Sequence, residues 1–414
     1  MKVSARIPSV KEVEVNVSPN TTVARLKQII CDKLGLEENL TRLLLRGKPL
    51  NEKTQLTKLK VGSEKLEVDY FWSRQMILWG GEGQANLRDS RALIIGAGAI
   101  GNEAAKNLAM LGIRNLTIVD YDTVEVSNLS RMIFFDKTDS GRPKSRVLAE
   151  KLHLKYPHLK VTAVEGRLEK LPVNVFLDSD IILSGLDNFA SRVFLTSISR
   201  RYLVPMVDGG IAGYQCRVQT YIPPDDPCPL CPISSSQYGK LVGLRNPCDA
   251  PIEDIKIPSL PTTISLVASI QTQEVVKVLL GYKYYLENHS WPETTGKPLE
   301  GIWIADLKYN KYSTLKLAKN KNCLVCGEHG EAKDIVLRTE IPLTKLASPA
   351  ARGRYLRDIF PDSEDFLLFK ITGGTTSKLT EDSMHKNTLK KGDYLLVTLK
   401  RRSGEYSEAV AQLT

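Results

Sequence analysis

A glycine-rich turn between an apolar strand and a helix most constrains the fold of this chain. The stretch ALIIGAGAIGNEA predicts a strand over residues 92–95 and a helix over residues 102–111. Between them, Gly96, Gly98 and Gly101 form a GxGxxG turn. Glycine lets the backbone approach phosphate oxygens, and the start of the helix supplies N–H donors with a partial positive charge. The turn therefore predicts a nucleotide-binding, doubly wound α/β domain.

A second strand supports this prediction. Residues 116–119 are largely apolar, and Asp120 follows them, 19 residues after Gly101 (120 minus 101). That spacing is typical of a carboxylate that accepts hydrogen bonds from ribose hydroxyls. NAD satisfies the same pattern, so these residues alone leave the nucleotide open.

Polar residues downstream argue against NAD. Asn128, Arg131 and Lys144 form a cationic, hydrogen-bonding set, where a hydride-transfer enzyme has no triphosphate to neutralise. A further apolar strand, residues 180–183, leads to Asp187. The carboxyl ends of neighbouring strands converge on one crevice, so we expect Asp187 near the glycine turn as a Mg²⁺ ligand. The alternative for Arg131 and Lys144 is a pair of solvated surface cations.

Five motifs follow one another in order: GAGAIG, VDYDTVEVSNLSR, GRPKSRV, LDNFASR and SLPTT. Together they resemble the adenylating superfamily of ubiquitin-activating enzymes and of the molybdopterin and thiamine pathway adenylyltransferases. The resemblance covers about residues 72–327 and implies ATP as the nucleotide. The contacts that it implies are Asp120 at the ribose, Asp122 elsewhere in the cofactor site, Asn128, Arg131 and Lys144 at the phosphates, and Asp187 at Mg²⁺.

An upstream stretch, FWSRQMILWG, resembles the SRQ element of the same superfamily. The arginine of that element reaches the γ-phosphate of ATP in the other protomer, so the resemblance assigns this role to Arg74 and implies a homodimer. One position departs from the pattern, because Met132 stands where the family usually has glutamine. Met132 lacks the hydrogen-bonding side chain of that glutamine.

The implied reaction starts from a carboxylate, which is a poor electrophile. It joins the C-terminal glycine carboxylate of a ubiquitin-like modifier to the α-phosphate of ATP and releases pyrophosphate. Such a step depends on positioning and on charge neutralisation, which Arg74, Arg131, Lys144 and Mg²⁺ would supply.

Four of the seven cysteines stand in two CxxC pairs, in DDPCPLCPIS and KNCLVCGEHG. Each pair can offer two thiolates from one tight turn, so Cys228, Cys231, Cys323 and Cys326 predict a tetrahedral, structural zinc site. The resemblance supports this reading, because the superfamily splits its zinc site over a long separation. A redox role is the alternative. Paired free thiols also favour a reducing, cytoplasmic location.

A fifth cysteine, Cys248, stands in the polar stretch GLRNPCDAPIEDIKIPSLPTT, close to Arg245. A loop thiol near a cation is favoured as the thiolate. The resemblance places the catalytic cysteine of activating enzymes in this crossover loop, residues 233–263, where it receives the modifier as a thioester. The alternative is a bystander thiol.

Two flanking segments predict further domains. Residues 1–70 show a ββαβ order and resemble ubiquitin in TVARLKQIICDKLGL and RLLLRGKPL, with Asn20 or Thr21 expected to cap the helix and Gly35 to end it. We expect a β-grasp docking module there, and the alternative is a solubilising appendage. Residues 333–414 contain two apparent strands and a helix. By position they resemble the ubiquitin-fold domain that recruits a conjugating enzyme, although a stabilising extension is the alternative.

Charge and hydropathy exclude some partners. The net charge is +10, but cationic residues are interspersed with acidic ones, so we expect a phosphate-rich ligand or acidic partner and no nucleic acid. The N-terminal residues MKVSARIPSVKEVEV lack an apolar signal region. The most apolar long stretch, residues 264–280, contains Gln271, Glu274 and Lys277, so no membrane span is expected.

Three function classes follow. The first is a compact activating enzyme that adenylates a modifier, carries it on Cys248 and passes it to a conjugating enzyme. The second is an adenylyltransferase that serves sulfur transfer to a sulfur-carrier protein. The third, a scaffold subunit without activity, is disfavoured because Asp120, Arg131, Lys144 and Asp187 are all present.

Overall fold

The computed structural model describes the chain except for residues 60–63, 187, 235–257, 334, 347, 373–374, 381–388 and 405. The chain forms two compact units. Unit 1 consists of residues 1–90, 110–114 and 279–297, and unit 2 of residues 91–109, 115–278 and 298–414. The domain limits at 1–70, 72–327 and 333–414 stay a prediction.

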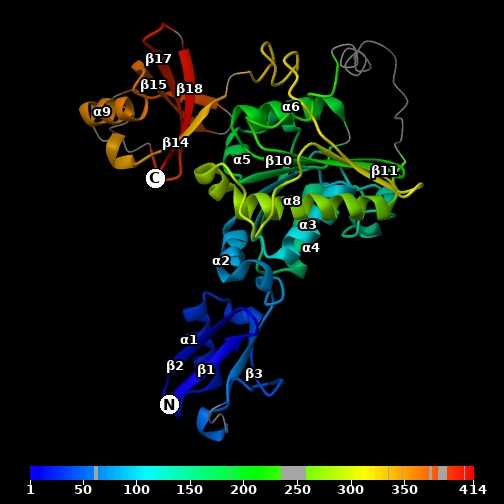
Figure 1. Ribbon diagram of the computed structural model, residues 1–414, viewed down its shortest axis with the longest axis vertical. Helices are drawn as coiled ribbons and strands as arrows, with labels where there is room; N and C mark the ends of the chain where they lie inside the picture. Colours follow the sequence, from blue (N-terminus) through cyan, green and yellow to red (C-terminus); the bar gives the residue numbers. More distant parts are fainter. Residues whose placement is uncertain are drawn as a thin grey trace. The chain divides into compact units, whose positions relative to one another are not determined.

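Unit 1 begins with a five-stranded sheet in the order β2-β1-β5-β3-β4, with one helix packed on it (Figure 1). The alternating residues Val3, Ala5 and Ile7 of β1 are buried in one core with Leu26 and Ile30 of α1. The predicted ββαβ order is confirmed. The elements are β1 (Lys2–Ile7), β2 (Lys11–Asn16), α1 (Val23–Leu34), η1 (Glu38–Leu40), β3 (Thr41–Leu45), β4 (Lys48–Pro49), η2 (Leu56–Lys58) and β5 (Leu66–Tyr70).

The ends of α1 test the predicted caps. Thr22 is the N-cap, and its hydroxyl accepts a 3.3 Å hydrogen bond from the Arg25 N–H, so the prediction of Asn20 or Thr21 was wrong. Thr21 instead donates its backbone N–H to Ser18 within the preceding turn. The predicted end is confirmed, because Gly35 caps the helix with a left-handed φ of 70°.

A second helix of unit 1, α2 (Met76–Asp89), is anchored by polar side chains. Gln75 and Gln84 both donate to the carbonyl of Leu111, at 2.7 and 2.9 Å, and the Trp72 indole donates to Met110 at 2.8 Å. Short chain segments that lie far apart in sequence therefore complete this unit.

Unit 2 contains an eight-stranded sheet in the order β13-β12-β11-β10-β9-β6-β7-β8. The strands from β10 to β8 are parallel, and β11, β12 and β13 extend the sheet antiparallel. The strands are β6 (Arg91–Ile95), β7 (Asn115–Asp120), β8 (Lys160–Glu165), β9 (Ile181–Ser184), β10 (Met206–Ala212), β11 (Gln215–Tyr221), β12 (Ile302–Asp306) and β13 (Lys311–Leu315). The helices of this part of the chain are α3 (Ala99–Leu111), η3 (Val126–Asn128), η4 (Lys137–Asp139), α4 (Lys144–Lys155), η5 (Leu168–Lys170), α5 (Asn174–Leu177), α6 (Phe189–Arg201) and α8 (Pro261–Asn288). The last residues of α3, from 110, and of α8, from 279, belong to unit 1.

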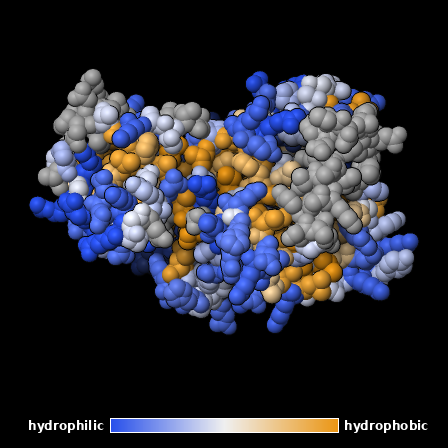
Figure 2. Space-filling view, turned by 90° about the horizontal axis from the view of Figure 1, so that it is seen from above, coloured by the Kyte–Doolittle hydropathy of each residue, from blue (hydrophilic) through white to orange (hydrophobic). Residues whose placement is uncertain are grey.

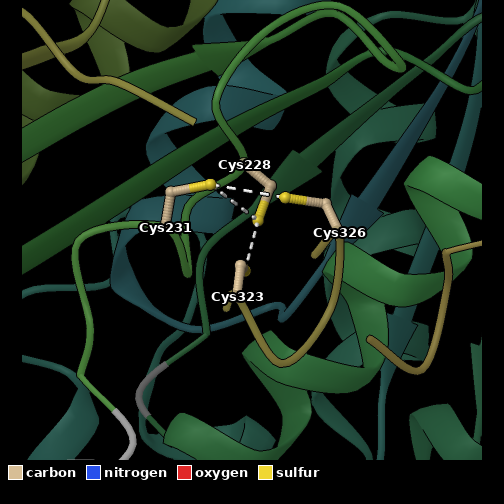
Figure 3. A group of neighbouring side chains, drawn as sticks. All are labelled: Cys228, Cys231, Cys323 and Cys326. Carbon is tan, nitrogen blue, oxygen red and sulfur yellow. Dashed lines mark hydrogen bonds between the residues drawn. The ribbon is translucent and has the colours of Figure 1, made fainter. Parts of the chain in front are cut away.

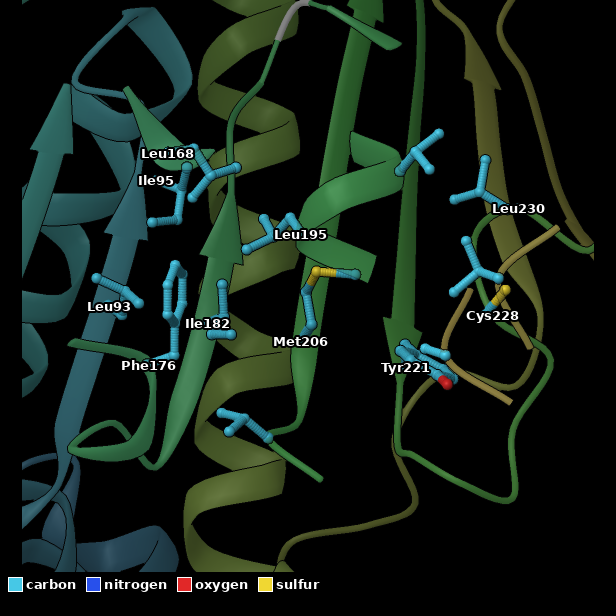
Figure 4. Close-up of a cluster of buried hydrophobic side chains, with 14 of the residues drawn as sticks. Leu93, Ile95, Leu168, Phe176, Ile182, Leu195, Met206, Tyr221, Cys228 and Leu230 are labelled. Atoms are coloured by element: carbon cyan, nitrogen blue, oxygen red, sulfur yellow. The ribbon is translucent and has the colours of Figure 1, made fainter. Parts of the chain in front are cut away.

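The core of this sheet lies between its strands and the helices beside them. Leu93 and Ile182 project from β6 and β9 into one cluster with Phe176 of α5 and Leu195 of α6, while α8 passes behind the strands (Figure 4). Continuous apolar strands buried on both faces are typical of a parallel sheet covered by helices. The expected doubly wound α/β class is confirmed for this part of the chain.

Helix α8 is, within the described residues, the one helix long and apolar enough to span a membrane, and 56% of its most apolar window is buried. Its polar residues bond to the sheet. Gln271 Nε2 donates to the carbonyls of Ser184 and Val207, at 2.9 and 3.1 Å, and Glu274 accepts from the Thr220 hydroxyl at 2.9 Å. Such contacts are typical of the core helix of a folded domain.

The C-terminal part of unit 2 forms a further five-stranded sheet, ordered β14-β18-β17-β15-β16. Its first and last strands pair in parallel, as in the N-terminal sheet, but β14 is an edge strand here. The expected strands and helix in this segment are confirmed. They are β14 (Leu337–Ile341), η6 (Leu343–Leu346), α9 (Pro349–Ile359), β15 (Ser363–Thr372), β16 (Thr375–Lys378), β17 (Tyr394–Arg401) and β18 (Tyr406–Leu413).

Candidate nucleotide and metal sites

The glycine turn joins β6 to α3. Gly96 has a left-handed φ of 97°, and its N–H donates to the Val119 carbonyl of β7 at 2.8 Å. A Cβ atom on Gly101 would lie 1.9 Å from the Gly96 carbonyl oxygen, so only glycine fits there. The helix begins at Ala99, three residues before the expected start at 102. Its first turn therefore includes Gly101, and its N-terminus adjoins the turn directly.

Asp120 ends β7 beside this turn. Its carboxylate accepts hydrogen bonds from the N–H of Ala97 at 2.6 Å and from the N–H of Asp122 at 2.7 Å. Burial raises the pKa of Asp120 above its usual value, although these hydrogen bonds and the nearby Lys144 oppose the shift. The carboxylate is thus fixed in orientation at the carboxyl end of its strand, next to the glycine turn.

Lys144 is not a solvated surface cation. It is the first residue of α4 and is buried, with 8% of its surface exposed. Its Nζ donates to Asp122 Oδ2 at 3.0 Å, and its backbone N–H donates to the Asp122 carbonyl at 2.9 Å. The structure therefore brings Asp120, Asp122 and Lys144 together at one end of the sheet.

Asn128 and Arg131 lie on the short helical segment that follows. Asn128 is buried, and its side-chain oxygen accepts from the Glu125 N–H at 3.1 Å, which closes a capping box. Arg131 donates from Nη1 to the Ser127 carbonyl at 2.6 Å. Met132 is 5% exposed, so an apolar side chain packs where a polar glutamine was expected. Phosphate contacts by Asn128 and Arg131 stay a prediction.

One residue of this site was missed in the sequence. Asn102 is fully buried in α3, and its Nδ2 donates to the Ala97 carbonyl at 3.0 Å. Its Oδ1 accepts from the Phe134 N–H at 3.2 Å. Asn102 therefore fixes the glycine turn to the segment after Arg131. The only signal was a polar residue directly after the last glycine.

A buried charge cluster on β10, beside the end of β9, was also missed. Asp208 of β10 is 2% exposed and forms an ion pair with Arg192 of α6. Arg217 Nη2 of β11 lies 2.8 Å from the other carboxylate oxygen. Burial raises the pKa of Asp208, but the two arginines outweigh it and hold that pKa below its usual value. Arg192 also donates to the carbonyls of Leu186 and Gly209.

For three predicted site residues, the structure gives no position relative to Asp120, Asp122 and Lys144. Asp187 and Cys248 lie outside the described residues. Arg74 is exposed and belongs to unit 1, just before α2. Their roles at Mg²⁺, in the thioester and at the γ-phosphate stay predictions.

The four cysteines of the two CxxC pairs do meet (Figure 3). Their sulfur atoms all lie within 4.8 Å of one another, with 3.5 Å between Cys228 and Cys323 and 3.3 Å between Cys231 and Cys326. Four sulfurs around a tetrahedral zinc, at about 2.3 Å each, lie roughly 3.8 Å apart. The donor set and its spacing therefore fit zinc.

The turn that carries the second cysteine pair is tight. A Cβ atom on Gly327 would lie 2.5 Å from the Cys323 carbonyl oxygen, and Asn320 Nδ2 donates to the Cys231 carbonyl at 3.3 Å. Three of the four cysteines are buried, and Cys326 is partly buried. The cluster is thus a closed site, as expected for structural zinc rather than for an exposed redox pair.

Comparison with known proteins agrees with this geometry. The model of the ThiF family matches residues 72–325, which is more than half of the chain. This chain belongs to the ThiF family. The model of the ubiquitin family matches residues 2–66, so the N-terminal part of unit 1 is ubiquitin-like.

Relatives of this ThiF-family chain include molybdopterin-synthase adenylyltransferases and activating enzymes of the E1 type. The molybdopterin-synthase adenylyltransferase of Escherichia coli is 30% identical over 62% of this chain and 96% of its own length. The SAMP-activating enzyme E1 of Haloferax volcanii is 32% identical over 63% of this chain and 89% of its own. The NEDD8-activating enzyme E1 catalytic subunit of Saccharomyces cerevisiae is 36% identical over 36% of this chain and 52% of its own.

A solved structure shares the fold of the ThiF-family part. The microcin C7 biosynthetic enzyme MccB, in complex with N-formylated MccA, has a TM-score of 0.50 and 20% identity. The likeness covers 62% of this chain and 75% of that one. At this identity it supports the fold alone. The family itself identifies the protein as an adenylating enzyme of the E1-like type, which implies the use of ATP.

Proposed function

We propose that this enzyme activates the C-terminal glycine of a ubiquitin-like modifier in two steps. In the first, an oxygen of the glycine carboxylate attacks the α-phosphorus of ATP, and pyrophosphate leaves. In the second, the thiolate of Cys248 attacks the acyl carbon, and AMP leaves. The thioester is then handed to a conjugating enzyme. The observation that carries the first step is the fixed arrangement of Asp120, Asp122 and Lys144 beside the glycine turn.

The residues of this proposal divide into three roles. Asp120 orients the ribose, because its carboxylate is already fixed by the N–H groups of Ala97 and Asp122. Lys144 neutralises phosphate charge, and it is pre-positioned by its bond to Asp122. Removing charge from a transferring phosphate by a fixed cation needs no reorganisation at the moment of reaction. In the proposal Arg131 and Asn128 assist at the phosphates, and Asp187 holds the Mg²⁺ that screens them.

Two further parts of the proposal concern partners. The modifier ends in Gly-Gly, the N-terminal ubiquitin-like part is a docking module, and residues 333–414 recruit the conjugating enzyme. A homodimer completes each site with Arg74 of the other copy, and the enzyme works in the cytoplasm. Figure 2 shows hydrophobic side chains among hydrophilic ones on one face of the molecule.

A second candidate function stops at the first step. The molybdopterin-synthase adenylyltransferase of Escherichia coli matches this chain over 96% of the relative's own length. This match favours an adenylyltransferase that serves sulfur transfer. Both candidates share adenylation and the zinc site. They differ in the fate of the acyl adenylate: a thioester on Cys248, or a thiocarboxylate formed with a sulfur donor.

One experiment separates the two. Protein, ATP, Mg²⁺ and a Gly-Gly modifier are incubated, and a conjugate that thiol reductant removes is sought on a gel. Cys248→Ala should retain modifier-dependent ATP–pyrophosphate exchange and lose the conjugate. Cys216→Ala, at a buried strand cysteine, is the matched control and should keep both. A conjugate that survives Cys248→Ala, or thiocarboxylate as the sole product, would favour the sulfur-transfer function.

Action across the dimer needs its own test. Arg74→Ala and Asp187→Ala proteins should each lose exchange, and mixing them should restore part of it, because one composite site is then intact. A strict monomer in solution, or no recovery on mixing, would refute the role of Arg74 in trans.

A further inference from the structure

The two cysteine pairs come from distant parts of the sequence, and each lies next to a turn with backbone bonds of its own. Before the first pair, the Asp226 N–H donates to the Ile222 carbonyl at 3.1 Å, and the Ile222 N–H donates to the Asp226 carboxylate at 3.0 Å. After the second pair, the Ala332 N–H donates to the Val325 carbonyl at 3.0 Å. These bonds shape each turn separately and do not join one turn to the other.

Arg200, in the last turn of α6, bonds to both segments. Its Nε donates to the Ala332 carbonyl at 2.8 Å, and its Nη1 donates to the Pro224 carbonyl at 3.2 Å. Pro224 precedes Cys228, and Ala332 follows Cys326. A planar guanidinium presents its N–H donors in fixed directions, so one side chain can hold two carbonyls at once. Arg200 therefore joins the segment before the first pair to the segment after the second.

Helix α6 holds the base of this side chain in place. Leu195 of α6 is fully buried, in the cluster that also contains three of the four zinc-site cysteines. Ser199 is fully buried as well, and its hydroxyl donates to the Val204 carbonyl at 2.6 Å. Groups carried by packed helices are held more precisely than groups carried by loops. The guanidinium thus starts from a fixed point beside the cysteines.

The charge of Arg200 also suits this place. Four thiolates around a Zn²⁺ ion leave about two negative charges in excess. Tyr221 is fully buried in the same cluster as Cys228 (Figure 4). Burial raises the pKa of the Tyr221 hydroxyl, Cys228 raises it further, and Arg200 opposes the rise. The positive charge of Arg200 is therefore felt inside the cluster that holds the cysteines, and a nearby cation lowers the cost of burying negative charge.

A cation in the last turn of a helix can also serve the helix itself, because the carbonyls there carry a partial negative charge. The bonds of Arg200 to positions 224 and 332 reach segments far from α6 in the sequence. Its neighbour Arg201 lies in the same turn and instead pairs with Glu408, at 3.0 Å, on the surface. Arg201 thus shares the place at the helix end and provides a matched comparison.

We propose that Arg200 is a positioning residue of the zinc site. It holds the segments that flank the two cysteine pairs against each other, and it offsets part of the negative charge of the four thiolates. The inference goes beyond the proposed function, because it concerns a residue outside the set of metal ligands and applies to both candidate functions. It depends on the fit of the four cysteines to zinc.

The first test measures the rate at which the full-length, zinc-loaded protein loses zinc to a chromogenic chelator. Arg200→Met should speed this loss about 10–100-fold, the usual effect of removing a residue that supports metal ligands without touching the metal. Arg200→Lys keeps the charge but cannot reach both carbonyls with a planar group, so its rate should be intermediate. Arg201→Met should lose zinc at the wild-type rate.

A second readout separates positioning from a general loss of stability. Cobalt(II) replaces zinc, and the thiolate-to-cobalt charge-transfer absorption is recorded. Arg200→Met should shift this band, because the charge around the thiolates changes, whereas Arg201→Met should not. Val193→Ala is the control for stability, because Val193 is a buried residue of the same helix and cluster. It should lower the melting temperature and leave the band in place.

Three results would overturn the inference. The first is an Arg200→Met protein with the wild-type rate of zinc loss and an unshifted band. The second is equal acceleration of zinc loss by Val193→Ala, since Arg200 would then act through stability alone. The third covers an Arg200→Met protein that does not fold: in that case, Arg200→Lys with the wild-type rate would refute the role. Wild-type protein without zinc would contradict the metal site itself, and the inference with it.

Discussion

Lys144 makes two bonds to one residue: its Nζ lies 3.0 Å from Asp122 Oδ2, and its backbone N–H donates to the Asp122 carbonyl at 2.9 Å. The side chain is therefore held in place before any phosphate arrives. We expect Lys144→Ala to lower the rate of ATP–pyrophosphate exchange about 10²–10³-fold, as when one fixed electrostatic donor is removed from an active site. Lys155→Ala, at an exposed position of the same helix, should leave the rate unchanged. A Lys144→Ala enzyme at the wild-type rate would remove this residue from the site.

The zinc site makes a prediction about stability. Cys228→Ser should lower the melting temperature strongly, because a structural zinc site contributes directly to folding free energy. The exchange rate of the protein that remains folded should fall far less. Metal analysis should find one zinc per chain in the wild type, and a chelator should reproduce the loss of stability. Cys216→Ala, outside the cluster, is the control and should keep the zinc. Full stability in metal-free protein would contradict the structural role.

The buried pair of Arg192 and Asp208 predicts a large mutational cost. Arg192→Met should reduce the free energy of unfolding by about 3–5 kcal/mol at neutral pH, because it leaves a buried carboxylate with one partner fewer. The lowered pKa of Asp208 sets the pH dependence. Its stabilisation is present above the pKa of an unfolded aspartate, about 3.9, and is lost as pH falls through the lower folded pKa. Chemical denaturation as a function of pH measures both effects.

A surface ion pair provides the comparison. Arg42 lies 3.1 Å from Asp69, and both side chains are exposed, at 71% and 42%. Arg42→Met should cost less than about 1 kcal/mol. If Arg192→Met and Arg42→Met lower the free energy of unfolding by the same amount, the buried pair of Arg192 and Asp208 does not contribute more than a surface ion pair.

The pH dependence of stability that Asp120 contributes should be opposite in sign to that of Asp208. Its folded pKa is raised by burial, so the unfolded chain ionises first as pH rises. In nucleotide-free protein, the stability of the wild type relative to Asp120→Asn should therefore fall as pH rises from about 3.9 to the folded pKa, then stay constant. Unfolding free energies of the two proteins across acidic pH measure this difference. A difference that rises with pH would mean that the carboxylate is stabilised, not strained, by its surroundings.

Local features of the nucleotide site could be predicted from sequence, whereas contacts between distant elements could not. The turn at Gly96–Gly101 and the acid at Asp120 are set by spacing within one βαβ unit. Asp208 has partners on α6 and β11, and only the folded sheet brings them together. The two cysteine pairs are an exception, because sequence predicted one shared four-cysteine site and the four sulfurs do lie within 4.8 Å of one another.

Small errors at element ends have physical causes. Helix α8 begins at Pro261, three residues before the apolar stretch 264–280, since proline is favoured in the first turn of a helix, where its missing N–H costs nothing. The helix after the glycine turn starts earlier than expected because Gly101 packs on the Gly96 carbonyl and so joins the first turn. In both cases the first residue of the helix is set by local backbone geometry, which the pattern of apolar residues does not reveal.

The three-segment make-up of unit 1 has a consequence for synthesis and for proteolysis. Its ubiquitin-like core uses residues within 3–76 and can close early on the ribosome. The full unit also needs residues 110–114 and 279–297. It therefore cannot be completed before nearly three quarters of the polypeptide has emerged. For the same reason, one protease cut between residues 90 and 110 should not free this unit intact, because its remaining parts stay covalently joined to the other fragment.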